Sequence, residues 1–269
     1  MTDLISPLMA LIRLVAYAGW TLLLLPVQIV AVAVSRPLSF TVPQLYHRGA
    51  LGVLGLKVDR KGVPVRSRPV LYVSNHASYL DIHVLGALLN GSFVAKQEVA
   101  SWPLFGLFAK LQRSVFVDRK RGSSADQRDR VAERLAMGDS LILFPEGTSS
   151  DGNRVLPFKS ALLSVAEQEV AGRPPTVQPI SLAYARHSNM PMGRALRPFY
   201  AWYGDMGLVG HIWRVLGLGP AVVAVRFHAP VTIADFGGRK ELSRHCEQVI
   251  GQGVIEAIYG TPPPVRAAA

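Results

Sequence analysis

The chain has 269 residues, of which 49% are hydrophobic, and its 29 lysine and arginine residues against 18 acidic residues give a net charge of +11. This length suits one sizeable domain with an anchor, and the single cysteine, Cys246, excludes an intrachain disulfide and is compatible with a reducing compartment. The basic balance favours anionic lipid surfaces or acidic acyl carriers, whereas the spread of the basic residues and the absence of a zinc-finger or RNA-binding signature argue against nucleic acid.

The first predicted element is an apolar helix over residues 14–34, a stretch without charge. Such a helix would be roughly 31 Å long, about the hydrocarbon thickness of a bilayer. Pro26 interrupts the run, so a kinked spanning helix and a broken helix pair embedded in one leaflet are equally consistent with it. A cleaved signal peptide fits less well, because its apolar core would be shorter. Basic residues crowd the C-terminal side of the run, which predicts a cytoplasmic catalytic domain.

A histidine with a carboxylate five residues later follows the first predicted strand, at residues 70–73. His76 suits a general base near neutral pH, and Asp81 could fix its tautomer. The two side chains can meet only if His76 lies in the turn before a helix predicted over residues 80–89, for which Ser74 and Asn75 offer capping groups. The alternative is a core histidine followed by a helix-start acid.

The simplest chemistry for such a site is direct attack by a substrate hydroxyl, deprotonated by His76, on an acyl thioester. No serine of a G-x-S-x-G elbow and no downstream cysteine and histidine pair marks a covalent nucleophile. His83 lies close to His76 and Asp81 in sequence, but no H-E-x-x-H pattern or cysteine pairing supports a metal site.

Three further segments follow in order: S-V-F-V-D-R at residues 114–119, F-P-E-G-T at 144–148 and V-Q-P-I-S at 177–181. Together with N-H-x4-D at residues 75–81, they match the four sequence blocks of the lysophosphatidate acyltransferase-like glycerolipid acyltransferases. Over about residues 70–182 the chain therefore resembles that family. The resemblance implies that His76 is the catalytic base and Asp81 its partner.

The resemblance also implies that Arg119 and Lys96 contact the phosphate or another anionic group of the acceptor, which fits the donor geometry of both side chains. For Lys96 a solvated basic face is the competing interpretation. Glu146 would hold Arg119 or accept a hydrogen bond from a glycerol hydroxyl. Gly147 would let the backbone turn or approach the ligand, and with Thr148 it completes a turn that can hold a polar substrate. An ordinary turn is the alternative for this segment.

One departure from the family concerns the residue after Thr148, which is commonly arginine but is Ser149 here. The lost positive charge weakens the case for a phosphate-bearing acceptor, although Arg154 and Lys159 are near in sequence. We expect lysophosphatidate as the acceptor, with a lysolipid of another headgroup, such as lyso-ornithine lipid, as the alternative.

Apolar runs alternate with helical patterns along the rest of the chain, which predicts an α/β domain with a mainly parallel central sheet flanked by helices. We expect an N-terminal membrane anchor at residues 1–50, the α/β acyltransferase domain at 51–260 and a loose tail at 261–269. The predicted strands are residues 70–73, 92–95, 115–117, 141–144, 177–182 and 221–227, and the predicted helices are 80–89, 124–136 and 160–169.

Two aromatic stretches, residues 99–108 and 199–213, suit either a membrane interface or core packing. At an interface they would border an acyl-chain tunnel or a lipid entrance.

The sequence thus predicts a membrane-bound O-acyltransferase of the inner or cell membrane. It would need no cofactor besides acyl-CoA or acyl-carrier protein as co-substrate, and its partners would be membrane lipids and that donor, with no nucleic acid and no metal. A non-catalytic lipid-binding protein of the same fold, or a thioesterase, are the competing interpretations. The oligomeric state is left open.

Overall fold

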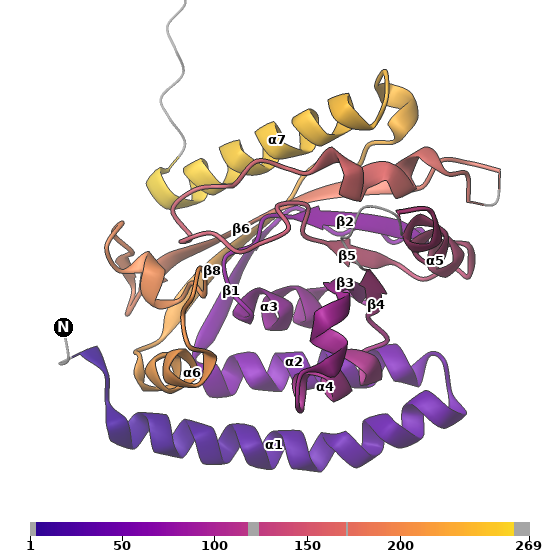
Figure 1. Ribbon diagram of the computed structural model, residues 1–269. Coiled ribbons are helices and arrows are strands. Elements are labelled where there is room, and N and C mark those ends of the chain that lie inside the picture. The colour runs from indigo at the N-terminus through magenta and orange to yellow at the C-terminus, as the bar shows by residue number, and fades with distance from the viewer. Residues whose placement is uncertain (1–3, 118–123, 171, 261–269) are drawn as a thin grey trace, which may run out of the picture.

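A mixed sheet lies at the centre of the computed structural model, which describes residues 4–117, 124–170 and 172–260 (Figure 1). Within those ranges the strand order is β1-β8-β6-β2-β5-β3-β4, with the short β7 paired to β6. The strands are β1 Leu56–Lys61, β2 Val70–Ser74, β3 Ser92–Lys96, β4 Val115–Val117, β5 Leu141–Leu143, β6 Thr176–His187, β7 Met190–Pro191 and β8 Ala221–Phe227.

The mainly parallel character of the sheet is confirmed. The strands β6, β2, β5, β3 and β4 form one parallel block. β8 runs antiparallel to β6, and β1 is parallel to β8. In the parallel block the carboxyl ends meet at one edge, which is where α/β proteins place their ligands.

Helices cover both faces of the sheet. In Figure 1, α7 crosses the upper face, α3 and α2 lie below the sheet, and α1 forms the outermost layer. The helices are α1 Pro7–Val34, α2 Leu38–Leu54, α3 Leu80–Leu88, α4 Phe105–Leu111, α5 Ser124–Ala136, α6 Leu208–Gly217 and α7 Arg239–Tyr259. The α-helix predicted over residues 160–169 is instead a 3₁₀ segment, Ser160–Glu167. The tail predicted at residues 261–269 lies outside the described residues.

The N-terminal segment is a pair of helices, and the break falls later than Pro26. Ser6 caps α1 by accepting from the Met9 N–H at 3.2 Å, and the helix continues through Pro26 to Val34. The chain leaves the helix at Ser35, and Pro37, which has no backbone N–H to continue α1, precedes the first residue of α2. By length and hydropathy α1 could cross a membrane, and most of its large apolar side chains are exposed.

Both ends of α1 are attached to the α/β body. Near its start, Arg13 donates to the carbonyl oxygens of Leu216 and Leu218 at the end of α6. Just past its end, Arg36 donates to Asp139 at 2.8 Å. The helix therefore lies along one side of the domain.

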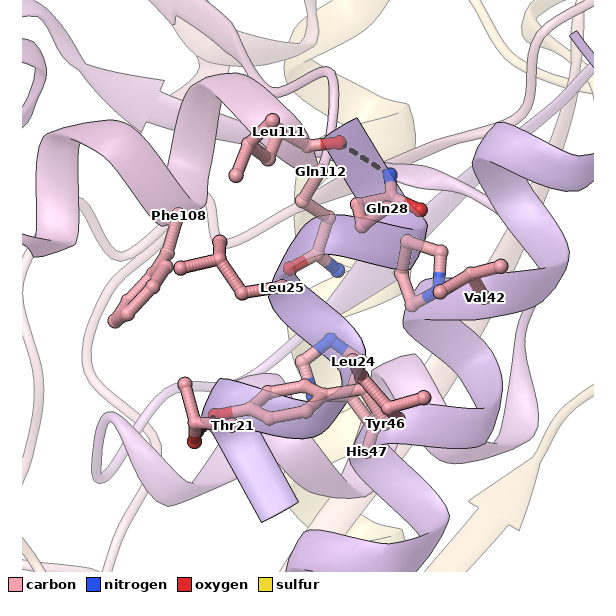
Figure 2. Close-up of a pocket in the computed structure, with 11 residues that line it drawn as sticks. Thr21, Leu24, Leu25, Gln28, Val42, Tyr46, His47, Phe108, Leu111 and Gln112 are labelled. Carbon is pink, nitrogen blue, oxygen red and sulfur yellow. Dashed lines mark hydrogen bonds between the residues drawn. The ribbon is translucent and has the colours of Figure 1, made fainter. Parts of the chain in front are cut away.

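A cavity of about 60 Å³ lies between α1, α2 and α4 (Figure 2). Gln28 is buried beside it and donates to the carbonyl oxygens of Leu111 at 2.6 Å and Ser39 at 3.1 Å. Because Leu111 ends α4 and Ser39 begins α2, this one amide joins all three helices.

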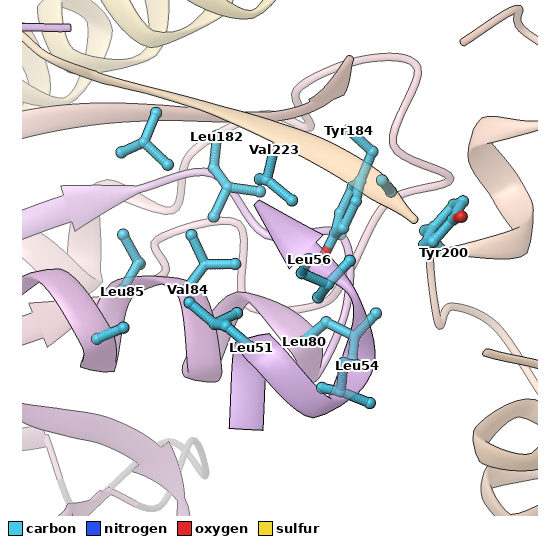
Figure 3. Close-up of a cluster of buried hydrophobic side chains, with 14 of the residues drawn as sticks. Leu51, Leu54, Leu56, Leu80, Val84, Leu85, Leu182, Tyr184, Tyr200 and Val223 are labelled. Carbon is cyan, nitrogen blue, oxygen red and sulfur yellow. The ribbon is translucent and has the colours of Figure 1, made fainter. Parts of the chain in front are cut away.

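Apolar clusters fill both sides of the sheet, as period-two alternation in a buried strand requires. Val70 and Tyr72 of β2 face the cluster that lies between the sheet and helices α2 and α3. Leu51, Leu80 and Val84 contribute to this cluster (Figure 3). Leu71 and Val73 face the opposite cluster, which contains Leu242, Cys246 and Ile250 of α7.

Candidate active site

The turn between β2 and α3 brings His76 and Asp81 together. The Nδ1 atom of His76 lies 2.9 Å from Oδ2 of Asp81, and the histidine side chain is 21% exposed whereas the carboxylate is fully buried. A carboxylate can only accept here, so Nδ1 carries the hydrogen and Nε2 keeps its lone pair. The predicted position of His76 before the helix is what permits the contact.

The capping role expected for Ser74 and Asn75 is wrong. The helix begins after Tyr79 without a side-chain cap. Asp81 instead closes the turn before the helix, because its Oδ2 atom also accepts from the backbone N–H groups of Ala77 at 2.7 Å and Ser78 at 2.9 Å. Asn75 instead pairs with a neighbouring strand: its side chain accepts from the Leu182 N–H and donates to the Leu182 carbonyl, both at 2.8 Å. The other oxygen of Asp81 accepts from the Tyr184 hydroxyl at 2.7 Å.

The segment after β5 packs directly against His76. The Phe144 ring stacks on the imidazole, with centroids 4.2 Å apart and an interplanar angle of 18°. The N–H of His76 donates to Oε1 of Glu146 at 2.8 Å, and its carbonyl accepts from the Ser150 N–H at 2.9 Å. The first and third sequence blocks therefore form one unit in space.

Glu146 is 2% exposed, and its second oxygen accepts from the Leu156 N–H at 3.0 Å. Burial raises the pKa of this carboxyl to about 8, although its two backbone donors act in the opposite direction. Its carboxylate thus fixes backbone on both sides of the site. The contacts predicted for it with Arg119 or a substrate hydroxyl stay predictions, because Arg119 lies outside the described residues.

A cavity of about 420 Å³ opens beside His76 and is mostly apolar, in the size range of sites for small ligands. Three of the predicted site residues line it: Gly147, Thr148 and Lys96. Lys96 is exposed at the edge of the cavity, and the exposed Glu98 also lines it. The apolar walls come from β3, β5, α3 and the aromatic segments, and include Tyr79, Ile82, Phe93, Val94, Val99, Trp102, Phe105, Leu143, Phe144, Trp202, Tyr203 and Leu208.

The aromatic stretches contribute to this cavity and to the protein surface together. Trp102 and Phe105 line the cavity while being 40% and 39% exposed. Trp202 lines it too, and its backbone N–H donates to the Ala77 carbonyl at 2.8 Å. These aromatic side chains therefore line the cavity and are also part of the protein surface.

The departure at Ser149 is not compensated inside the cavity by the neighbouring cations. Ser149 donates its hydroxyl to the Trp202 carbonyl, while Arg154 and Lys159 are exposed and are not among the lining residues. Across the described ranges, no group of three or more histidine, cysteine or acidic side chains is placed to hold a metal ion.

Sequence reasoning missed Tyr184 and the pairing of Asn75. The signal for Tyr184 is present in the spacing, because it lies two residues after Leu182 on a buried strand and so faces the same side. Nothing in the chain near Asp81 shows that this side is the catalytic one.

The chain is similar to known acyltransferases. A family model described as Acyltransferase matches residues 56–183. The chain is 40% identical over 253 residues to a lyso-ornithine lipid O-acyltransferase of Brucella abortus, covering 93% of this chain and 95% of the relative. It is 34% identical over 206 residues to a 1-acyl-sn-glycerol-3-phosphate acyltransferase of Neisseria gonorrhoeae, covering 76% of each chain.

A solved structure has the same fold. The crystal structure of the 1-acyl-sn-glycerophosphate acyltransferase PlsC from Thermotoga maritima superposes with a TM-score of 0.70 at 22% identity. The match covers 95% of this chain and 97% of that one.

Proposed function

This chain belongs to the acyltransferase family that includes lyso-ornithine lipid and 1-acyl-sn-glycerol-3-phosphate acyltransferases, and we propose that it moves a fatty acyl group from an acyl thioester to a lysolipid hydroxyl. The observation that carries the proposal is the buried contact between His76 and Asp81 at the edge of a largely apolar cavity. The donor would be the thioester of coenzyme A or of acyl-carrier protein. No further cofactor enters the reaction.

In the proposed reaction His76 is the general base. Its Nε2 atom takes the proton of the lysolipid hydroxyl as the oxygen attacks the thioester carbonyl carbon. Asp81 stabilises the imidazolium that forms. When the tetrahedral intermediate collapses, the carbon–sulfur bond breaks and the imidazolium returns its proton to the thiolate. The products are an ester and a free thiol, without an acyl-enzyme.

The remaining candidates would position the reactants. Lys96 and Arg119 would hold the anionic part of the acceptor or donor, and Gly147 and Thr148 would form the turn beneath it. Glu146 would act on the backbone, because it fixes the His76 N–H and the turn that follows β5. Positioning of this kind contributes to the rate by holding reacting atoms in contact.

We propose a lyso-ornithine lipid as the acceptor. Two relatives with that name, from Brucella abortus and Rhizobium meliloti, are 40% and 41% identical over 93% and 89% of this chain. The uncharged Ser149 supports an acceptor without a phosphate. Lysophosphatidate, which the sequence motifs favour, is the second candidate and is supported by the relative from Neisseria gonorrhoeae.

We also propose that the enzyme sits in one leaflet of the inner membrane with its catalytic domain cytoplasmic. The contacts of Arg13 and Arg36 hold both ends of α1 to the same body, so a helix that crosses the bilayer would have to break one set. The outer faces of α1, α4 and α6 expose large apolar side chains, among them Leu22, Leu107 and Val209. Such a surface suits burial in the interfacial region.

The deciding experiment measures acyl transfer by the purified full-length chain in detergent, from labelled acyl-CoA and acyl-carrier protein, to lyso-ornithine lipid and to lysophosphatidate. His76→Ala should lower the rate at least about a thousandfold. His245→Ala on α7, across the sheet from the site, is the matched control and should leave the rate unchanged. Release of labelled fatty acid at a rate that does not depend on added lysolipid would indicate a hydrolase. No turnover with either donor would indicate a binding protein.

A further inference from the structure

The buried end of the catalytic pair holds a group that none of the sequence motifs contains. Tyr184 of β6 is 1% exposed, and its hydroxyl lies 2.7 Å from Oδ1 of Asp81, the oxygen that His76 does not use. The carboxylate therefore has three kinds of donor: an imidazole and two backbone N–H groups on Oδ2, and a phenol on Oδ1.

Tyr184 acts as the donor in this contact. Burial raises the pKa of its hydroxyl well above its ordinary value of 10, and the nearby charge of Asp81 acts in the same direction. The phenol is therefore the donor, since an ionised carboxylate can only accept.

The position of the tyrosine is set by the strand. The side chain of Asn75, adjacent to His76, forms two hydrogen bonds of 2.8 Å with the backbone of Leu182. Two residues further along β6, Tyr184 returns to the same face and reaches Asp81. β6 thus contacts the catalytic turn at two points, and a slip in register would break both.

A neighbouring tyrosine provides an internal comparison. Tyr200 stacks on Tyr184, with centroids 5.6 Å apart and an interplanar angle of 16°, and is equally buried (Figure 3). Its hydroxyl pairs with His187 at 2.7 Å and with the Gly219 carbonyl at 3.2 Å. The two phenols share one apolar environment, and only the hydroxyl of Tyr184 is bonded to the catalytic carboxylate.

We propose that Tyr184 is a positioning residue for the acyl transfer, fixing the orientation of Asp81 and sharing its negative charge, so that His76 is held in one tautomer with tuned basicity. The inference rests on the proposed function of His76 and Asp81. A hydrogen bond from a phenol withdraws charge from a carboxylate and so lessens its stabilisation of the imidazolium.

Other ionisable groups surround the pair and stay in place when Tyr184 is changed. Glu146 contacts the His76 backbone, Tyr79 precedes α3, and Lys96 and Glu98 lie at the edge of the cavity. The Tyr184 hydroxyl interacts with the Ser78 side chain as well as with Asp81, so a change confined to this hydroxyl alters these two contacts and leaves the other groups in place.

The test compares Tyr184→Phe with Tyr200→Phe in the full-length protein. Tyr184→Phe should lower kcat about tenfold with KM unchanged, because the base loses its alignment rather than a substrate contact. The acid limb of the kcat/KM profile of this variant should move to higher pH. Without the phenol hydrogen bond, the Asp81 carboxylate keeps more negative charge and stabilises the imidazolium form of His76 more strongly. Tyr200→Phe should change neither by more than about twofold. Wild-type values for Tyr184→Phe, or equal effects in both variants, would overturn the inference.

A spectroscopic measurement separates this inference from the proposed function. The Nδ1 proton of His76, identified by its loss in His76→Ala, should give a downfield proton resonance that Tyr184→Phe shifts and Tyr200→Phe does not. If the wild type transfers no acyl group, the proposed function fails, and the resonance then reports only whether Tyr184 orients Asp81 and His76. Unchanged spectra in Tyr184→Phe would reject the inference. If Tyr184→Phe does not fold, 3-fluorotyrosine at position 184, a stronger donor, should shift the same resonance in the opposite direction.

Discussion

Asp81 stabilises its own surroundings as well as the imidazole. The same oxygen that faces His76 closes the turn by accepting from the N–H groups of Ala77 and Ser78. A hydrogen bond to an ionised acceptor contributes more than one between neutral groups. The residue that orients the base is therefore also the residue that builds the loop on which the base sits, and its removal would affect stability and catalysis together.

At the residue scale, Glu146 gives a pH dependence with a definite sign. Its folded pKa of about 8 lies above the ordinary 4.5, so the folded state retains a proton that the unfolded state has released. Stability from this group is present below about pH 4.5 and is lost as pH rises to about 8. We expect the difference in melting temperature, wild type minus Glu146→Gln, to fall as the pH rises from about 4.5 to about 8.

Thermal melts at several pH values measure this difference. Glu133→Gln, at an exposed position of α5, controls for the loss of one acidic side chain and should give a nearly constant difference. A difference between wild type and Glu146→Gln that stayed constant, or rose with pH, would contradict the assignment.

At the scale of elements, Asp139 connects the helix pair to the α/β body. It is 2% exposed and pairs with Arg36, before α2, at 2.8 Å and with Arg134 of α5 at 2.6 Å. A third guanidinium group, that of Arg113, lies 4.0 Å from the same carboxylate, so losing the negative charge of Asp139 leaves all three without their anionic partner.

We expect Asp139→Asn to lower the free energy of unfolding by about 2 kcal/mol, as measured by denaturant titration. The comparison is Glu167→Gln, whose partner Arg239 lies at 3.1 Å with both side chains more than a third exposed. That exposed pair should contribute less than about 0.5 kcal/mol. Equal effects would mean that Asp139 does not connect these elements.

Across the whole molecule, the apolar surfaces of α1, α4 and α6 lie on the side away from α7 (Figure 1). Trp102 and Phe105 are exposed and also line the catalytic cavity. In the proposed single-leaflet arrangement, a lysolipid and an acyl chain would reach His76 from the bilayer without crossing water. The basic net charge of +11 adds attraction to anionic lipid.

The single-leaflet arrangement predicts where the two ends of α1 lie. Cysteines introduced by Leu4→Cys and Ser35→Cys should both react with an impermeant maleimide in inside-out vesicles and neither in right-side-out vesicles. The native Cys246 will not interfere, because it is fully buried and burial raises its pKa to about 12. Labelling of the two sites from opposite sides would establish a spanning helix instead.

The elements that the sequence predicted are those with strong local patterns. Six apolar runs became strands because they are buried on both faces and read as continuous hydrophobic stretches. β1 was missed because it is an edge strand whose burial falls off along Leu56–Lys61 and whose side chains are largely charged. α7 was missed because its buried positions, such as Leu242 and Ile250, are separated by many polar residues.

The sequence by itself predicted the contact of His76 with Asp81, because only four residues separate them and a helix start between them lets the two side chains meet. It also determined the apolar helix and the parallel α/β plan. Tertiary structure decided the rest: Tyr184 and Leu182 reach the catalytic turn from more than 100 residues away. The course of α1 along the domain likewise depends on contacts with α4 and α6. Periodicity describes which face of an element is buried, and only packing determines which distant side chains meet there.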